Sequence, residues 1–99
     1  MARVATQAYD AASYLKTDAD CALYLQAVID EADGDPGMVV TALGEIARAR
    51  GMMQLARETG LTREGLYRAL SADGNPSFAT VMKVCKALGL KLHAEAAGA

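Results

Sequence analysis

The chain has 99 residues, a formal net charge of −2, no Trp and one Phe. A chain of this length forms one domain and leaves little room for an enclosed active site, while its abundant Ala and Leu favour helices. No apolar run approaches the roughly 20 residues that span a bilayer, and MARVATQAYD at the N-terminus lacks a signal-peptide core, so we expect a cytoplasmic protein without a membrane segment.

Residues 1–16 carry little helical patterning. We expect them to form an N-terminal arm that is mostly extended, with Tyr9, Tyr14 and Leu15 as possible anchors.

The first helix is predicted to begin at Thr17, a good N-cap. Asp18 and Asp20 follow in the first turn, where the helix dipole favours negative charge. One apolar face then recurs at helical spacing. Its members are Cys21, Leu25, Val28 and Ala32.

The stretch DGDPG predicts a stop and a restart. Gly34 can end the first helix, Asp35 can cap the next, and Pro36 suits the first helical position because its missing N–H has no helical partner to lose. The second helix is expected to reach Arg50, with Gly51 as its C-cap.

MMQLARET then predicts a helix of about two turns that ends at Gly60, and Thr62 is the N-cap of a further short helix. Ala56 is small where the two helices would cross, and Gly60 tolerates a positive φ. Four apolar residues can pack this pair of helices against the core: Leu55, Leu61, Leu66 and Leu70.

ADGNPS is predicted to be a loop, and Ser77 to cap a fifth helix that ends at Gly89. The expected inner face of that helix is Phe78, Val81, Met82, Cys85 and Leu88.

LKLHAE, residues 90–95, alternates apolar and polar residues as a short strand would. An exposed strand edge is normally paired or covered, so we expect this segment to pair with a second copy or to pack at a dimer contact. The predicted architecture is all-α, with five helices and a short C-terminal strand over residues 17–95. Residues 96–99 are a frayed tail.

Residues 52–71 match the helix-turn-helix arrangement, in which the second helix enters the major groove of DNA. Arg63 or Arg68 could read guanine, and Glu64 could accept from cytosine. Tyr67 is equally a packing residue or a DNA contact. The candidate DNA-binding set is Gln54, Thr62, Arg63, Glu64, Tyr67, Arg68, Asn75 and Ser77, and the residues that shape the motif are Ala56, Gly60 and Leu66.

Acidic and basic residues are unevenly distributed along the chain. Residues 1–50 hold four Lys/Arg and eight Asp/Glu, whereas residues 51–99 hold six and four. Between Arg48 and Arg68 there are five Arg and two Glu. An acidic half and a basic segment suit two different partners.

An enzyme is not expected. The only His is His93, near the C-terminus; no nucleophile has a visible base, no ligand cluster has metal spacing, and no Gly-rich phosphate loop follows a strand, so we predict no cofactor or metal. Cys21 and Cys85 have no CxxC companion and are read as buried small apolar residues, with a disulfide or metal ligand as the alternative.

Residues 44–92 resemble the addiction-module antidote family, the HigA-like antitoxins of the Xre/Cro helix-turn-helix group. The GNPSF loop followed by VMKVCKALGLKL carries the resemblance, and YLK and ALGEIARARG extend it over roughly residues 9–95. Wider Xre domains often hold a phosphate with a Gln near the start of the first motif helix, where this chain has Met52.

The resemblance implies a lambda-repressor-like fold, a homodimer on double-stranded operator DNA, and repression of the chain's own operon. It also implies a small basic RelE/ParE-like toxin as partner. The residues that could face that toxin are Asp18, Asp20, Asp30 and Glu31, with Asp33 and Asp35 beside them; a solvated helix face is the alternative. The alternative functions are a stand-alone prophage-type repressor and a helical protein-interaction module without DNA binding.

Overall fold

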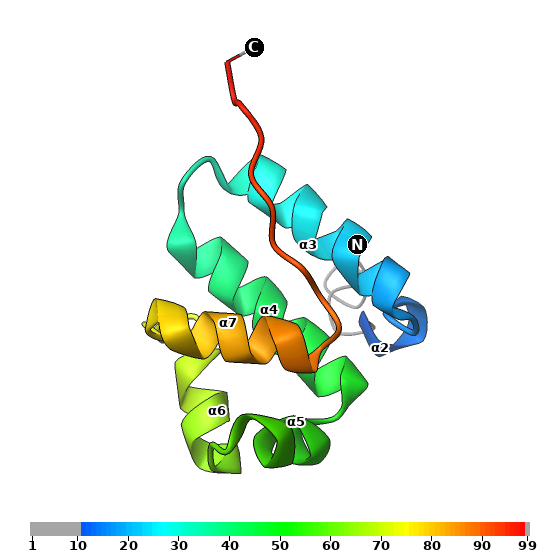
Figure 1. Ribbon diagram of the computed structural model, residues 1–99, viewed down its shortest axis with the longest axis vertical. Coiled ribbons are helices and arrows are strands. Elements are labelled where there is room, and N and C mark those ends of the chain that lie inside the picture. Colours follow the sequence, from blue (N-terminus) through cyan, green and yellow to red (C-terminus); the bar gives the residue numbers. More distant parts are fainter. Residues whose placement is uncertain (1–10, 99) are drawn as a thin grey trace, which may run out of the picture.

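A computed structural model describes residues 11–98, and the all-α prediction is confirmed for them. Five helices of seven or more residues follow a single helical turn, α2 (Figure 1). None of the described helices is long and apolar enough to cross a membrane. The bounds are α2 Ala11–Tyr14, α3 Asp18–Ala32, α4 Pro36–Arg50, α5 Met52–Thr59, α6 Arg63–Ala69 and α7 Phe78–Ala87.

The predicted start of α3 is confirmed, and it carries a complete capping box. The Thr17 hydroxyl accepts from the backbone N–H of Asp20 at 3.0 Å, and the Asp20 carboxylate accepts from the backbone N–H of Thr17 at 3.1 Å. Each side chain therefore satisfies a backbone donor that the helix itself leaves unpaired.

The turn between α3 and α4 is short because two consecutive residues take positive φ. Asp33 lies at φ 49° and Gly34 at φ 91°, directly after the last helical residue. Asp35 then caps α4, accepting from the N–H of Gly37 at 2.9 Å, with Pro36 at the first helical position as predicted. This turn makes α3 and α4 antiparallel neighbours (Figure 1).

The core lies where α3, α4 and α7 meet the paired helices α5 and α6. It reaches from Leu15, just after α2, to Leu90 at the start of the C-terminal tail, and α3, α4, α5, α6 and α7 all contribute to it. Burial of this apolar surface is the main term that stabilises the fold. The buried cluster is Leu15, Cys21, Leu25, Ala42, Leu43, Ile46, Ala47, Met52, Leu55, Leu66, Leu70, Val84, Cys85, Leu88 and Leu90.

A backbone contact joins α4 to the residue that follows α6. A Cβ placed on Gly44 would lie 2.4 Å from the carbonyl oxygen of Leu70, which is closer than real Cβ contacts come. Only glycine permits α4 to approach that carbonyl. The sequence pattern did not single out Gly44.

The N-terminal segment differs in part from the extended arm that we predicted. Residues 11–14 form the turn α2, which packs against α4, and Leu15 is a core residue. Tyr14 is about half exposed and meets the Tyr24 ring edge-on. Tyr9 lies outside the described residues.

The predicted inner face of α7 is partly wrong. Val81, Cys85 and Leu88 face the core as expected, together with Val84, which the prediction omitted. Phe78 is 72% exposed and Met82 is also exposed. The buried stripe thus runs at i, i+3, i+4 and i+7 from Val81, and the first turn of α7, which begins at Phe78, lies at the margin of the molecule (Figure 1).

The predicted C-terminal strand is not present in the described chain. Residues 90–98 form a loop that passes α3 (Figure 1). Its neighbour is a helix, whose backbone groups are already paired, so the alternating pattern has no strand to bond with. Only the start of the segment is fixed: Leu90 is buried and its N–H donates to the carbonyl of Cys85 at 2.8 Å.

Candidate functional site

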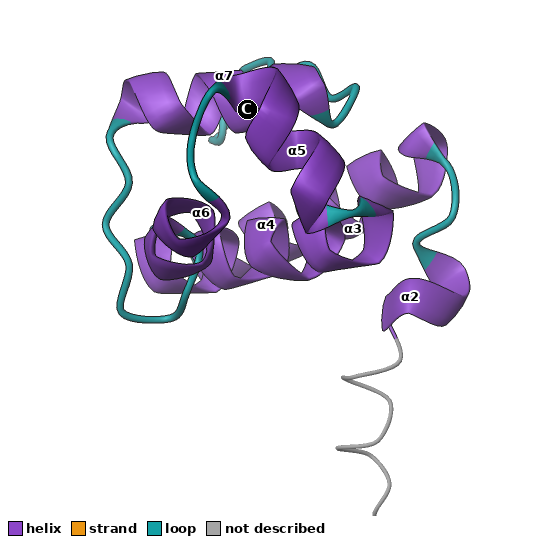
Figure 2. Cartoon of the chain, turned by 90° about the horizontal axis from the view of Figure 1, so that it is seen from below, coloured by secondary structure: helices purple, strands orange, loops and turns teal. Residues whose placement is uncertain are grey.

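The helices α5 and α6 form a pair joined by three residues; Figure 2 shows α6 nearly end-on and α5 running obliquely across the view. Gly60 lies at φ 78° and donates its N–H to the carbonyl of Ala56 at 2.9 Å, which ends α5 as predicted. The Thr59 hydroxyl donates to the carbonyl of Leu55 at 2.8 Å and accepts from the N–H of Leu61 at 3.3 Å. These bonds fix the turn on both sides.

The inner face of α6 anchors it to the core. Leu66 is fully buried, and Leu70, just past the helix, is nearly so. Thr62 caps the helix by accepting from the N–H of Gly65 at 2.9 Å, which confirms the predicted N-cap. The short helix is therefore held by packing and by its cap, and its outer face is left to solvent.

That outer face displays the predicted recognition residues together. Thr62, Arg63, Glu64, Tyr67 and Arg68 are all exposed, with Tyr67 at 42%. Within the described part of the chain, none of the charged members is in an ion pair. Tyr67 is therefore not a core residue, and the arginines are available to bind an anion.

Gln54, on the exposed face of α5, is already engaged. Its amide donates to Glu58 at 2.7 Å, and its carbonyl oxygen accepts from Arg57 at 3.0 Å. Met52, where wider Xre domains often have Gln, is a buried core residue. A DNA contact by Gln54 would require it to leave these neighbours.

The loop before α7 holds the other two candidates. The Ser77 hydroxyl caps α7, accepting from the N–H of Thr80 at 3.1 Å and donating to the Thr80 hydroxyl at 3.1 Å. Asn75 is exposed. Both residues lie in the loop that precedes α7.

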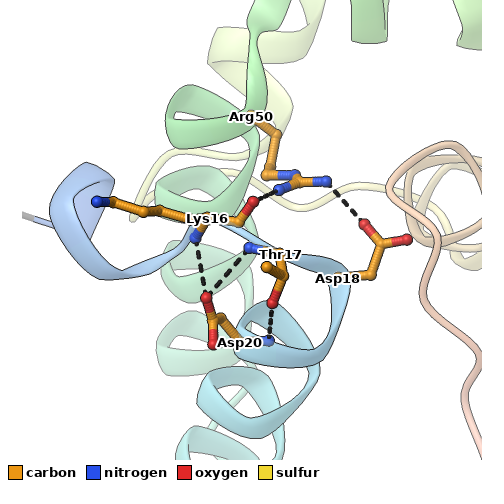
Figure 3. Close-up of polar contacts among 5 residues, drawn as sticks. All are labelled: Lys16, Thr17, Asp18, Asp20 and Arg50. Atoms are coloured by element: carbon orange, nitrogen blue, oxygen red, sulfur yellow. Dashed lines mark hydrogen bonds and ion pairs between the residues drawn. The ribbon is translucent and has the colours of Figure 1, made fainter.

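Two acidic candidates of the N-terminal half have internal partners (Figure 3). Arg50 donates to the carbonyl of Lys16 and, at 2.7 Å, to the carboxylate of Asp18. Asp20 accepts from the backbone N–H groups of Thr17 and Lys16, and these bonds hold its pKa below the usual range. Arg50, which the sequence indicated only as a basic helix end, thus ties α4 to the start of α3.

The other four acidic residues named for the toxin-facing surface lie in the last turn of α3 and in the α3–α4 turn. They are Asp30, Glu31, Asp33 and Asp35, and none of them has an ion pair among the described residues. Asp30 accepts from the Gln26 amide at 2.9 Å. From residue 17 to residue 47 the chain holds seven Asp/Glu and no Lys, Arg or His. We call the four clustered side chains the acidic rim.

Both cysteines are free and buried, as predicted. Burial raises the pKa of each thiol, so both stay protonated and behave as small apolar residues. A hydrogen bond from the Tyr24 hydroxyl to the Glu45 carboxylate joins α3 to α4. Burial, and to a lesser extent this hydrogen bond, raises the pKa of Tyr24. Across residues 11–98 no cluster of His, Cys, Asp or Glu is suited to hold a metal.

Comparison with known proteins identifies a family. Residues 5–96 match the family model described as "Probable addiction module antidote protein". A relative from Haemophilus influenzae, described as an uncharacterized protein, is 48% identical over 87 residues, which is 88% of each chain. No solved structure matches the chain.

Proposed function

The chain belongs to the family of probable addiction module antidote proteins, and from this premise we propose that it is the antitoxin of a type II toxin–antitoxin module. It neutralises a small basic RelE/ParE-like toxin. As a HigA-like, Xre-type helix-turn-helix protein it also represses its own operon. It acts in the cytoplasm, by binding alone, without a cofactor or catalytic step.

The exposed face of α6 carries the DNA-binding part of the proposal. Arg63, beside the capped start of the helix, and Arg68, in its last turn, are both exposed, and neither has an ion pair among the described residues. A guanidinium can fork onto the O6 and N7 atoms of guanine, and this helix is the exposed second member of a short, tightly turned pair.

A homodimer is part of the same proposal. A recognition helix of seven residues makes few base contacts, so two copies related by a two-fold axis are needed to reach half-sites one DNA turn apart. The operator is then an inverted repeat.

The acidic half carries the toxin-binding part. Asp30, Glu31 and their two neighbours have no ion pair within the described chain, and clustered like charges weaken a fold unless a partner neutralises them. Asp18 and Asp20 are supporting members, because they already hold Arg50 and the start of α3.

The DNA-binding test uses the double variant Arg63→Ala with Arg68→Ala and the DNA upstream of the chain's own gene. We expect each substitution to cost about 1–3 kcal/mol of specific binding. The matched control, Lys83→Ala with Lys91→Ala, removes the same charge from exposed positions outside α6 and should retain specific binding. Equal binding by the two variants would favour the protein-interaction module that does not read DNA.

The toxin test uses the chain tagged at its native locus and purified at moderate salt. We expect a small basic protein to accompany it in stable proportion, to arrest growth when expressed alone, and to be silenced by co-expression of this chain. Recovery of the upstream DNA alone would favour the stand-alone repressor.

A further inference from the structure

We propose that a groove between the α3–α4 turn and the start of α7 is the docking site for a basic, amphipathic segment of the toxin, with Phe78 as the apolar anchor and the acidic rim as the counter-charge. The proposal rests on the antitoxin function above and assigns it a specific surface.

The groove has a volume of about 680 Å³. Its walls come from the end of α3, the start of α4, the loop before α7 and the first turn of α7, which lie together at one margin of the molecule in Figure 1. Most of its lining is apolar and includes Ile29, Val39, Pro76, Phe78 and Val81. A surface of this kind is suited to a protein segment.

Phe78 is the residue that most needs an explanation. It is the only Phe in the chain, it lies 72% exposed on the rim of this groove, and it contributes nothing to the buried core. Ile29, on the opposite wall, is 37% exposed. Single exposed apolar residues are common, but a large aromatic side chain beside an apolar groove is typical of a binding anchor.

The acidic rim specifies the charge of the occupant. Asp35 lines the groove itself, and Asp33 lies beside it in the same turn. Residues 17–47 contain no Lys, Arg or His, and no ion pair of the described residues involves these carboxylates. Nucleic acid is repelled by such a rim, whereas a segment with Lys or Arg flanking apolar residues satisfies both the charge and the lining.

A second copy of this chain fits the groove poorly. A two-fold contact through the groove would bring the two acidic rims together, and like charges placed face to face oppose association. The partner is therefore a different protein that carries positive charge.

Two sets of variants test the site without threatening the fold. Phe78→Ala removes the anchor, and Leu23→Ala is its match because Leu23 is 73% exposed on α3 but does not line this groove. A neutral-rim variant combines Asp30→Asn, Glu31→Gln, Asp33→Asn and Asp35→Asn. Asn tolerates the positive φ at residue 33 and still caps at residue 35, so both turn and cap survive.

The probe is the basic protein that co-purifies with the tagged wild-type chain, and the readout is its affinity and association rate. We expect Phe78→Ala to weaken binding at least about thirtyfold, as an anchor residue does, and Leu23→Ala to change it less than about twofold. The neutral-rim variant should slow association by about tenfold and remove most of its salt dependence, whereas Glu95→Gln, at an exposed position outside the groove, should not.

The outcomes separate the two proposals. Wild-type affinity in both groove variants, with the toxin still neutralised, would overturn the docking site and leave the antitoxin function standing. If the wild-type chain binds no toxin, both fail. If Phe78→Ala instead dissociates a free dimer and leaves toxin affinity unchanged, the groove is a contact between copies and the proposal is overturned.

Discussion

Residues 17–47 and residues 48–68 adjoin in sequence and share one core, yet the first hold seven carboxylates and no cation, and the second hold five Arg and two Glu. Their outer faces differ as well: the acidic half borders an apolar groove, whereas α6 exposes polar side chains around Tyr67. A domain too small to enclose a site can thus offer two surfaces that attract opposite kinds of partner.

The largest expected effect concerns the core that the two regions share. Leu66→Ala should lower the free energy of unfolding by about 2–5 kcal/mol, because the side chain is fully buried and its loss leaves a cavity. Leu23→Ala, at an exposed position of α3, should change it by less than about 0.5 kcal/mol. Urea unfolding of both variants checks this, and equal effects would mean that α6 is not packed on the core.

Gly44→Ala tests the backbone contact between the regions. Alanine would favour helix α4 by about 1 kcal/mol, but its Cβ would overlap the Leu70 carbonyl, and overpacking typically costs about 1–3 kcal/mol. We expect net destabilisation in a thermal melt, together with weaker DNA binding from a displaced α6. A stabilised variant would contradict the close approach.

Thr17→Ala should cost about 1 kcal/mol, because it removes the cap of α3 and leaves a backbone N–H unpaired. The lost hydrogen bond lies at the start of α3, in the acidic half of the chain. Stability should therefore fall in urea unfolding while the DNA affinity of the folded protein stays unchanged. Weaker DNA binding in this variant would show that the two surfaces are coupled.

The smallest expected effect is on the stability of the protein at low pH. The pKa of Asp20 is lowered in the fold, so its carboxylate contributes stability above its unfolded pKa, and that contribution is lost as the pH falls through the folded pKa. Asp20→Asn should destabilise the protein at neutral pH and lose less further stability than wild type below about pH 4. Parallel pH profiles of the two proteins would contradict the capping role.

The sequence predicted the parts of the fold that depend on near neighbours. Thr17, Asp35, Thr62 and Ser77 were identified as caps because a cap acts within three residues of its own position. The exposed face of α6 followed from the same kind of spacing. Its proposed role in DNA binding stays a prediction.

Features that depend on distant parts of the chain were missed. The strand at residues 90–95 was wrong because alternation cannot tell whether a partner strand lies alongside. Phe78 was assigned to the core because periodicity does not show where a helix passes the edge of its neighbours. The groove joins two separate segments, residues 29–43 and 72–81, so no local pattern could reveal it.

The contact between Gly44 and Leu70 has a mechanical consequence. No side chain lies between the two backbones, so no flexible side chain can adjust when one backbone shifts against the other. Two residues beyond Leu70 the chain reaches Ala72, which already lines the groove. Leu70, which follows α6, is thus fixed against α4 only two residues before the groove wall begins at Ala72, so the end of α6 and that wall share one anchoring point.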